Sequence, residues 1–224
     1  MSIILLRLEG PMQSWGIGSR FTDRHTEAEP TKSGVVGLLS SILGRSREDN
    51  IEDLAMLEMA VRVDREGKIT YDYHTTLDVL RASAKGKVTP SKLGTVISRR
   101  FYIADACFIV GLRGENESLL LELINSLNSP KYPLFLGRKS FPASMPILLS
   151  QELIKDSLIE IMRSYPWQGR KCDNPPENLR LILECKPGEG EPRLDVPVSF
   201  KSRKFINRFV RTEFIPFESL MEVD

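Results

Sequence analysis

The chain has 224 residues and is 41% hydrophobic, which supplies enough apolar material for a core and argues against disorder. No apolar run approaches the ~18 residues of a membrane-spanning helix, and no basic segment followed by a hydrophobic one opens the chain. We therefore expect a cytoplasmic protein with no membrane partner. The three cysteines lack metal-binding spacing, which fits a reducing compartment and gives no case for zinc.

The net charge of +1 argues against a general nucleic-acid binder, but the charges are unevenly distributed. Six basic and no acidic residues lie between Val79 and Ala104, and five basic and no acidic residues lie between Ser199 and Arg211. Each window alone is typical of a solvated face. Two of them in so balanced a chain favour a track for RNA or DNA.

The first fifth of the chain predicts a strand, a loop and a helix. The apolar run from Ile3 to Leu8 ends at Gly10-Pro11, which predicts a buried strand entering a loop. A helix is predicted next, with Thr31 or Ser33 as its N-cap and Gly44 as its end. This order suits an anion site at a helix N-terminus, although neither a P-loop nor a dinucleotide-binding motif is present.

The loop before this helix carries a Trp and two Arg besides its glycines, a mixture that suits a flexible polynucleotide. Trp15 either stacks on a base or plugs the core beneath the loop, and burial is the commoner fate. Lys32 and Ser33 are the favoured positions, because donors and the positive helix dipole coincide there. A second glycine–basic loop begins at Gly137. The predicted RNA-binding residues are Gln13, Ser14, Trp15, Arg20, Arg24, Thr31, Lys32, Ser33, His74, Arg99, Arg100, Arg138, Lys139 and Ser140.

The remaining elements are predicted from apolar periodicity and turn residues. Strands are expected at 60–63, 69–73, 101–112, 134–136, 179–185 and 196–200, and helices at 115–127 and 151–163. Residues 75–100 predict a projecting β-hairpin or a partly ordered arm. Together these elements indicate an α+β, ferredoxin-like βαββαβ core with an insertion. The RNP1 pattern of RRM sheets is missing, so we expect contacts from loops and the arm.

Several segments resemble a known family in the right order. RLEGPMQSWG and PTKSGVVGLLSSILG resemble the N-terminal signature of the fifth CRISPR-associated protein family, in the RAMP superfamily. YDYHTTL, the segment around DACF, and YPLFLGRKSFP resemble its later blocks, so the likeness spans roughly residues 1–150. It is greatest to the type I-E member, the Cascade subunit that holds the 5′ handle of crRNA.

The resemblance implies an RRM-like core with a projecting thumb. We expect this core at residues 1–149, with its arm at about 75–100, and a small β-rich appendage at 150–224. The implied partners are the crRNA 5′ handle, the Cascade backbone subunit, the large subunit and, indirectly, target DNA. Cofactors and metals are not expected.

Catalysis is the main alternative, because type I-C relatives are implied to be endoribonucleases that process precursor crRNA with Tyr, Lys and His side chains. This chain has only His25 and His74, so Tyr73-His74 with Lys85 or Lys87 is the conceivable metal-independent group. A binding or packing role for His74 is favoured, and we predict a non-enzyme. A second alternative is a purely protein-binding scaffold, which would make the two basic windows incidental.

Overall fold

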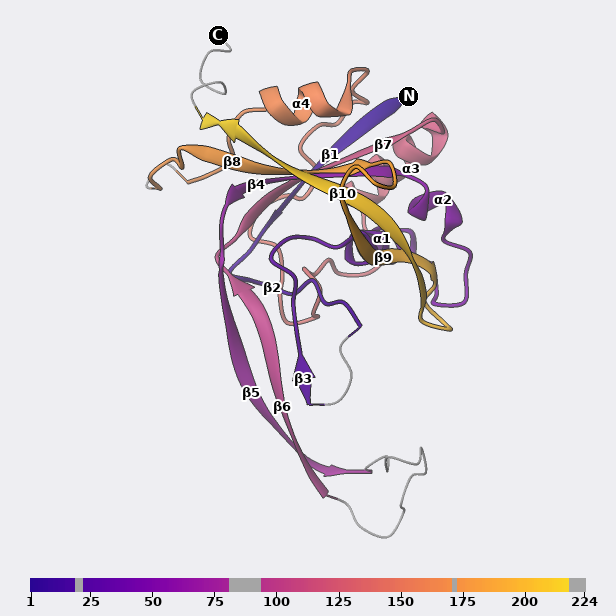
Figure 1. Ribbon diagram of the computed structural model, residues 1–224. Coiled ribbons are helices and arrows are strands. Elements are labelled where there is room, and N and C mark those ends of the chain that lie inside the picture. Colours follow the sequence, from indigo (N-terminus) through magenta and orange to yellow (C-terminus); the bar gives the residue numbers. More distant parts are fainter. Residues whose placement is uncertain (19–21, 81–93, 171–172, 218–224) are drawn as a thin grey trace.

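The computed structural model describes residues 1–18, 22–80, 94–170 and 173–217, and Figure 1 shows their arrangement around a curved sheet. This larger sheet consists, in spatial order, of β1 (Ser2–Glu9), β7 (Cys107–Gly114), β4 (Glu58–Arg65), β8 (Asn178–Cys185), β10 (Lys204–Pro216) and β9 (Glu191–Ser199). A smaller sheet places β6 (Gly94–Ala104) between β2 (Met12–Gln13) and β3 (Asp23–Arg24) on one side and β5 (Lys68–Val79) on the other. The helices are α1 (Lys32–Leu43), α2 (Glu52–Ala55), α3 (Glu117–Asn128) and α4 (Leu158–Ser164).

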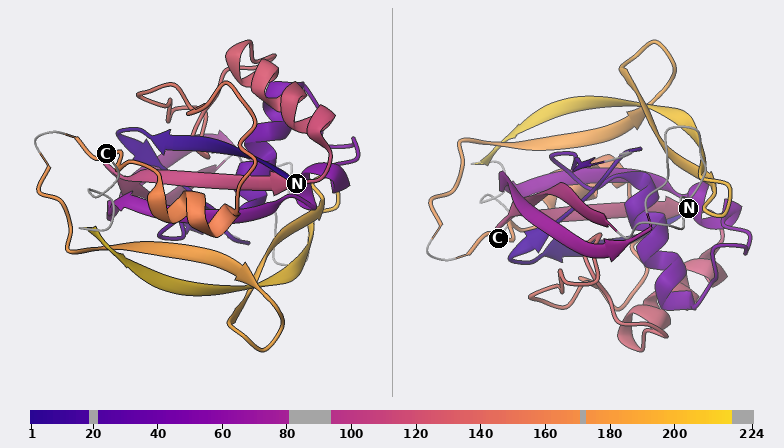
Figure 2. Two further views of the ribbon diagram at one scale, coloured as in Figure 1. Left: turned by 90° about the horizontal axis from the view of Figure 1, so that it is seen from above. Right: turned by 90° about the horizontal axis from the view of Figure 1, so that it is seen from below.

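Helices cover both faces of the larger sheet, since its central strands are apolar on both sides. Along β1, Ile4 and Leu6 face the core shared with α1 and α3, while Ile3 and Leu5 face the second core under α4. Figure 2 shows α4 on the side opposite α1. Burial on both faces explains why these strands read as continuous apolar runs and not as alternating patterns.

The first predicted elements are confirmed. β1 occupies the expected residues, and α1 is capped by Thr31, whose hydroxyl accepts a hydrogen bond of 3.2 Å from the Gly34 N–H. Gly44 ends the helix with φ +72°, a left-handed conformation that glycine adopts at little cost. The second predicted helix is also present as α3, capped by Asn116.

Three predicted elements are wrong in extent or kind. Residues 134–136 form no strand; short bridges at Leu148 and Ile154 lie beside β1 instead. The helix expected at 151–163 begins only at Leu158, because the backbone of Ile154 is hydrogen-bonded to Ile3. The strand expected at 101–112 is divided between β6 and β7 at Asp105, whose φ is +60°.

The last third of the chain continues the larger sheet. β8 pairs with β4, and β10 pairs with β8, so strands from both ends of the sequence form one layer. The sequence prediction does not include β10, because it assigns the basic residues between Ser199 and Arg211 to a nucleic-acid track. Arg208 is buried within that segment and ion-paired with Asp195 and Glu184. The division of the chain at residue 150 stays a prediction.

β5 and β6 form a long antiparallel hairpin that projects from the body of the molecule (Figure 1). It begins earlier than the predicted arm, with Lys68 paired to Ala104, and its pairing continues to Val79 and Gly94. The basic residues predicted at 81–93 lie outside the described residues. The hairpin carries β2 and β3 along the free edge of β6, and this arrangement positions the candidate site.

Candidate nucleic-acid interface

The two glycine-containing loops predicted as binding elements lie against each other. The N–H of Ser14 donates a hydrogen bond of 3.0 Å to the carbonyl oxygen of Leu136. Gly137 has φ +89°, and a Cβ there would lie 1.8 Å from the carbonyl oxygen of Ser14. Only glycine fits this close approach, so Gly137 joins the loops at one end of the fold.

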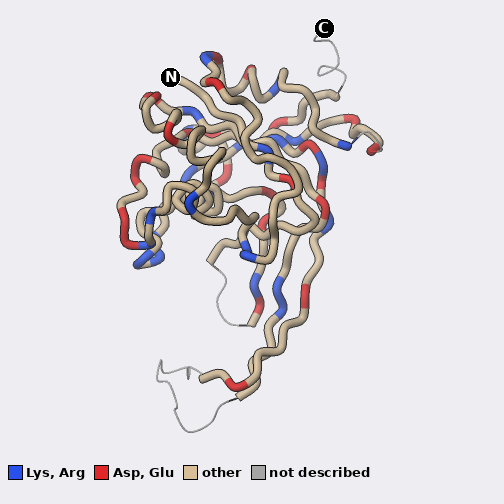
Figure 3. Tube along the Cα trace, turned by 180° about the vertical axis from the view of Figure 1, so that it is seen from behind, with Lys and Arg blue, Asp and Glu red and all other residues tan. Residues whose placement is uncertain are grey.

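The first loop follows the edge of β6. Gln13 pairs with Ile103 near the base of the hairpin, and Arg24 pairs with Arg100 further along. Figure 3 shows the basic positions of β3 and β6 side by side on the projecting part of the molecule. Two residues far apart in sequence thereby present their guanidinium groups in one place.

Three arginines border a surface hollow of about 500 Å³ at this junction. Arg24, Arg100 and Arg138 line it, together with His25 and the backbone of Gly16, Gly18 and Gly137. No acidic residue is found among the described residues that line it. We call this site the arginine hollow. Its positive charge and glycine backbone suit an anion such as a phosphodiester.

Arg138 is the most constrained of the three arginines. Its Nη2 donates a hydrogen bond of 2.6 Å to the carbonyl oxygen of Phe101, and its guanidinium lies 5.3 Å from the centroid of the Phe141 ring. Partial burial lowers the pKa of Arg138, and the charges of Arg100 and Arg24 lower it further, with Asp72 opposing them. The guanidinium stays protonated, so a bound anion would relieve the repulsion among the three cations.

Nearby carboxylates neutralise other predicted residues. Arg99 donates to Asp23 over 2.8 Å, so part of its charge is compensated within the fold. His74 is partly exposed on β5 and contacts the carboxylate of Asp72, which lies opposite Arg100 in the ladder. His74 therefore borders the arginine hollow through Asp72 and does not line it.

Gln13 and Trp15 support the first loop from below. The Gln13 amide donates to the carbonyl oxygens of Leu8 and Ala106 over 3.0 and 2.9 Å, and its oxygen accepts from the Trp15 indole N–H over 3.2 Å. Trp15 is only 1% exposed and packs in the core with Gly34 against its ring. Of the two fates weighed for Trp15, the structure shows the buried anchor.

The expected phosphate site at the start of α1 has to be corrected. The backbone N–H of Lys32 donates to the Asp195 carboxylate over 2.9 Å, and the Lys32 ammonium pairs with Glu184 over 2.9 Å. Burial acts to lower the pKa of Arg208, but hydrogen bonds and charge from Asp195 and Glu184 outweigh it and raise that pKa. The positive end of α1 is thus occupied by the protein's own carboxylate, with Lys32 only 5% exposed.

The other predicted residues are distributed as follows. Thr31 is buried as the helix cap, Ser33 is half-buried behind it, and Ser14 donates to the Phe101 carbonyl oxygen over 3.3 Å. Lys139 and Ser140 are exposed beyond Arg138, and Arg20 lies outside the described residues.

The sequence prediction does not include His25, which stacks on Phe101 with ring centroids 5.1 Å apart. Its position directly after Arg24 is the signal that could have included it.

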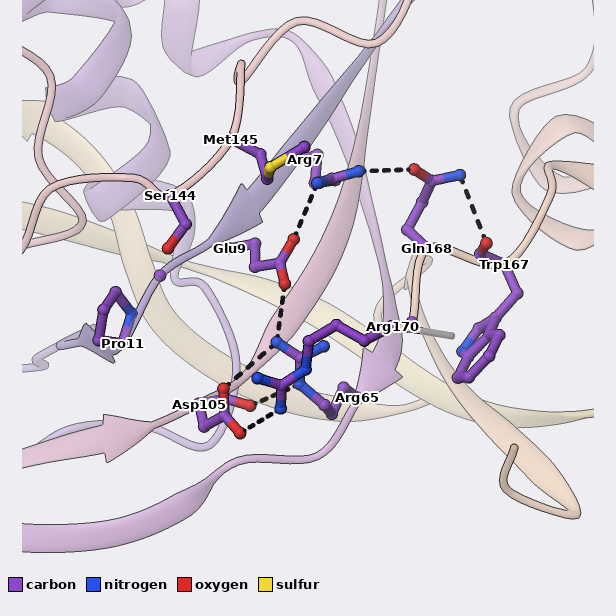
Figure 4. A pocket seen from close by; sticks show the side chains of 12 residues that line it. Arg7, Glu9, Pro11, Arg65, Asp105, Ser144, Met145, Trp167, Gln168 and Arg170 are labelled. Atoms are coloured by element: carbon purple, nitrogen blue, oxygen red, sulfur yellow. Dashed lines mark hydrogen bonds and ion pairs between the residues drawn. The ribbon is translucent and has the colours of Figure 1, made fainter. Parts of the chain in front are cut away.

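A second charged hollow, at the end of β1, is of a different kind (Figure 4). Its arginines are paired with carboxylates of the fold: Arg7 and Arg65 contact Glu9 over 3.0 and 2.8 Å, and Arg170 contacts Asp105 over 2.5 Å. The Arg170–Asp105 pair connects the segment after α4 to the turn between β6 and β7, and the other two pairs connect side chains at the ends of β1 and β4. The cluster is close to neutral, so it is a weaker anion site than the arginine hollow.

The described residues offer neither a metal site nor a membrane-spanning helix. They contain no group of three or more His, Cys, Asp or Glu side chains that could hold a metal ion. Among the helices they form, none has the length and apolar character needed to cross a membrane.

Comparison with protein families shows which family the chain belongs to. The family model described as CRISPR-associated protein (Cas_Cas5) matches residues 3–213. The chain belongs to the Cas5 family. Among curated proteins, the CRISPR system Cascade subunit CasD of Escherichia coli (strain K12) is 35% identical over 217 residues, covering 91% of this chain and 94% of CasD.

Solved structures of Cas proteins share the fold. A crystal structure of a Cas protein is 42% identical, with a TM-score of 0.76 and 97% of each chain covered. A chain of a CRISPR RNA-guided surveillance complex is 31% identical, with a TM-score of 0.78, covering 96% of this Cas5 chain and 92% of that chain. The mixed α+β fold with antiparallel sheets is therefore that of Cas5 structures.

Proposed function

We propose that this Cas5 protein is a crRNA-binding subunit of a type I-E Cascade complex and grips the repeat-derived 5′ handle. One observation carries the proposal at the level of residues: Arg24, Arg100 and Arg138 converge on one hollow that no described acidic residue lines. Its similarity to CasD, and to a chain of an RNA-guided surveillance complex, supports the same conclusion.

The arginine hollow acts by holding the RNA backbone. Guanidinium groups donate two parallel hydrogen bonds to phosphate, and the glycine loops let the strand approach the protein backbone closely. Lys139 and Ser140 extend the contact surface beyond Arg138, and Arg99 and His74 flank it on the hairpin. In complexes of this kind, base pairing of the guide reads the DNA sequence while proteins hold backbone and geometry.

We further propose a ferredoxin-like, RRM-like core, at residues 1–149, and a thumb formed by the β5–β6 hairpin. The spatial order β1-β7-β4, with α1 and α3 on one face, supports the first part. Short bridges at Leu148 and Ile154 take the place of the fourth strand beside β1. The projecting hairpin supports the assignment of a thumb, and this thumb would contact the neighbouring backbone subunit. The large subunit and, indirectly, target DNA complete the partners of this cytoplasmic complex.

The role we propose is structural and not catalytic. His74 is paired with Asp72 on an exposed strand, and a metal-independent ribonuclease also needs an acid and a group that stabilises the phosphorane. Processing of precursor crRNA is the alternative, and it would place His74 at the scissile phosphate.

Purification of the complex from its host, followed by sequencing of the bound RNA, tests the proposal. We expect crRNA that begins with a constant repeat-derived segment. The double variant Arg100→Gln/Arg138→Gln should carry less of this RNA than the wild-type chain at equal protein recovery. Equal RNA content in both would overturn the assignment of the arginine hollow.

A further inference from the structure

A third hollow, of about 900 Å³, adjoins the arginine hollow. The two share Gly18 and Gly137 in their walls, so they lie next to each other on the protein. Four aromatic side chains line this hollow, which we call the aromatic groove: Tyr132, Phe135, Phe200 and Phe205. Tyr132 and Phe135 come from the segment after α3, Phe200 from the turn between β9 and β10, and Phe205 from the start of β10.

The floor of the aromatic groove is α1, where it carries short side chains. Ser33, Gly37 and Ser41 lie along it. A Cβ added to Gly37 would lie 3.8 Å from the Phe200 ring, so a methyl group fits there in ordinary van der Waals contact and a larger side chain would reach into the groove. The rings are accessible as well, since Tyr132 is 52% exposed and Phe135 and Phe205 are half-buried.

The charge of the groove has one sign. Four basic residues and no acidic residue appear among the described residues that line it. Arg45 is paired with Asp53, but within the described parts of the chain no carboxylate lies at ion-pair distance from Arg47, Arg203 or Lys204. Cations around accessible aromatic rings are the combination by which proteins hold single-stranded nucleic acid, with bases on the rings and phosphates on the rim.

We propose that the aromatic groove receives unpaired bases of the same RNA strand whose phosphates lie on the arginine hollow. This inference rests on the proposed function and adds a second, base-stacking subsite to it. Its volume is in the range of ligand sites. The adjacent arginine hollow favours RNA over an apolar segment of a partner protein, and the excess of basic over acidic side chains among the lining residues favours a polyanion.

Binding of a fluorescein-labelled RNA to the full chain tests the inference. The RNA has the sequence of the repeat-derived 5′ end found on the co-purified RNA. Tyr132→Ala removes a stacking surface and Gly37→Leu fills the floor, so each should weaken binding about fivefold or more, with the salt dependence unchanged. The control is Phe214→Ala, which removes an equally aromatic side chain, 66% exposed, on β10 beside α4. It should bind like wild type.

Abasic substitution at each RNA position in turn then identifies the base. At least one abasic RNA should bind the wild-type protein at least about fivefold more weakly than the intact RNA does. The same abasic RNA should bind the Gly37→Leu variant as well as it binds the wild-type protein, because the base and the groove stabilise binding only as a pair. Thermal melting of each variant confirms that it is folded. Two groove variants keep the test valid if one fails to fold.

The outcomes separate this inference from the proposed function. If Arg138→Gln weakens binding and neither groove variant does, the groove holds no base and only this inference is wrong. If wild type itself does not bind the RNA, both fail. If the groove variants bind RNA normally but no longer assemble with other Cascade subunits, a protein occupies the groove and the inference is overturned.

Discussion

The carboxylate of Asp195 accepts a hydrogen bond of 2.9 Å from the backbone N–H of Lys32, the first residue of α1. Arg208 Nε donates a hydrogen bond of 2.8 Å to the other oxygen of this carboxylate, and Asp195 is only 1% exposed. A helix N-terminus attracts an anion wherever one is available. Here strand β9 supplies the anion from within the chain, so the RNA site that we propose lies in the loops beyond α1.

Asp195→Asn should therefore destabilise the fold. The change leaves the buried Arg208 with Glu184 as its remaining ion-pair partner and removes the negative charge at the N-terminus of α1, at a cost of about 3–5 kcal/mol in the free energy of unfolding. Urea unfolding followed by circular dichroism measures it. Asp156→Asn, a change of the same kind in an exposed loop, is the matched control and should be within about 0.5 kcal/mol of wild type. An equally stable Asp195→Asn protein would contradict the role assigned to this carboxylate.

Two glycines of α1 make a matched pair for the packing of Trp15. A Cβ at Gly34 would lie 2.7 Å from the Trp15 ring, whereas at Gly37 it would lie 3.8 Å from Phe200. Gly34→Ala should lower the free energy of unfolding by about 1–3 kcal/mol through overpacking. Gly37→Ala should leave it unchanged or raise it by up to about 1 kcal/mol, because alanine favours a helix. Equal effects in thermal melting would show that Trp15 does not constrain this position.

The salt dependence of RNA binding distinguishes the arginine hollow from the N-terminus of α1 as the site of phosphate contact. Each phosphate contact on a single strand contributes about −0.7 to the log–log slope of affinity against salt. Arg138→Gln should make the slope shallower by about 0.7, measured by fluorescence anisotropy between 50 and 200 mM salt. Lys32→Met should leave the slope unchanged, since its ammonium is already paired with Glu184. The reverse pattern would restore Lys32 as a phosphate contact.

The elements that sequence could predict are those specified by local signals. α1 has its cap, its apolar face and its terminal glycine within fourteen consecutive positions, from Thr31 to Gly44. The pairing of Arg24 with Arg100 and the contact of Gly137 with Ser14 depend on long-range packing that no local pattern encodes. Lys32 shows the same limit, because its neutralising partners lie more than 150 residues later in the chain.

The position of His74 leads to a negative prediction about catalysis. Purified protein should not cut repeat RNA, with or without a divalent metal, because His74 is paired with Asp72 at the margin of the arginine hollow. Denaturing gels of end-labelled repeat RNA measure this. Specific cleavage that is lost in His74→Ala, while Arg163→Ala retains it, would instead establish the processing ribonuclease.

The last prediction concerns the β5–β6 hairpin, because it exposes several large apolar side chains. Ile69, Tyr71, Tyr73 and Leu77 are exposed on β5, and Ile97 is exposed on β6. A two-stranded hairpin is marginally stable by itself in water, and exposed apolar surface on it marks a place where a partner binds.

Shortening the hairpin at the Thr76–Val96 pair, with a Gly-Ser turn joining the two residues, removes none of the described residues that form the two hydrophobic cores. The melting temperature should change by less than about 2 °C, because both cores stay intact. Assembly with crRNA and the backbone subunit, followed by gel filtration, should fail or weaken sharply. If the shortened chain melts much earlier but still assembles, the hairpin belongs to the folding unit and the thumb proposal is wrong.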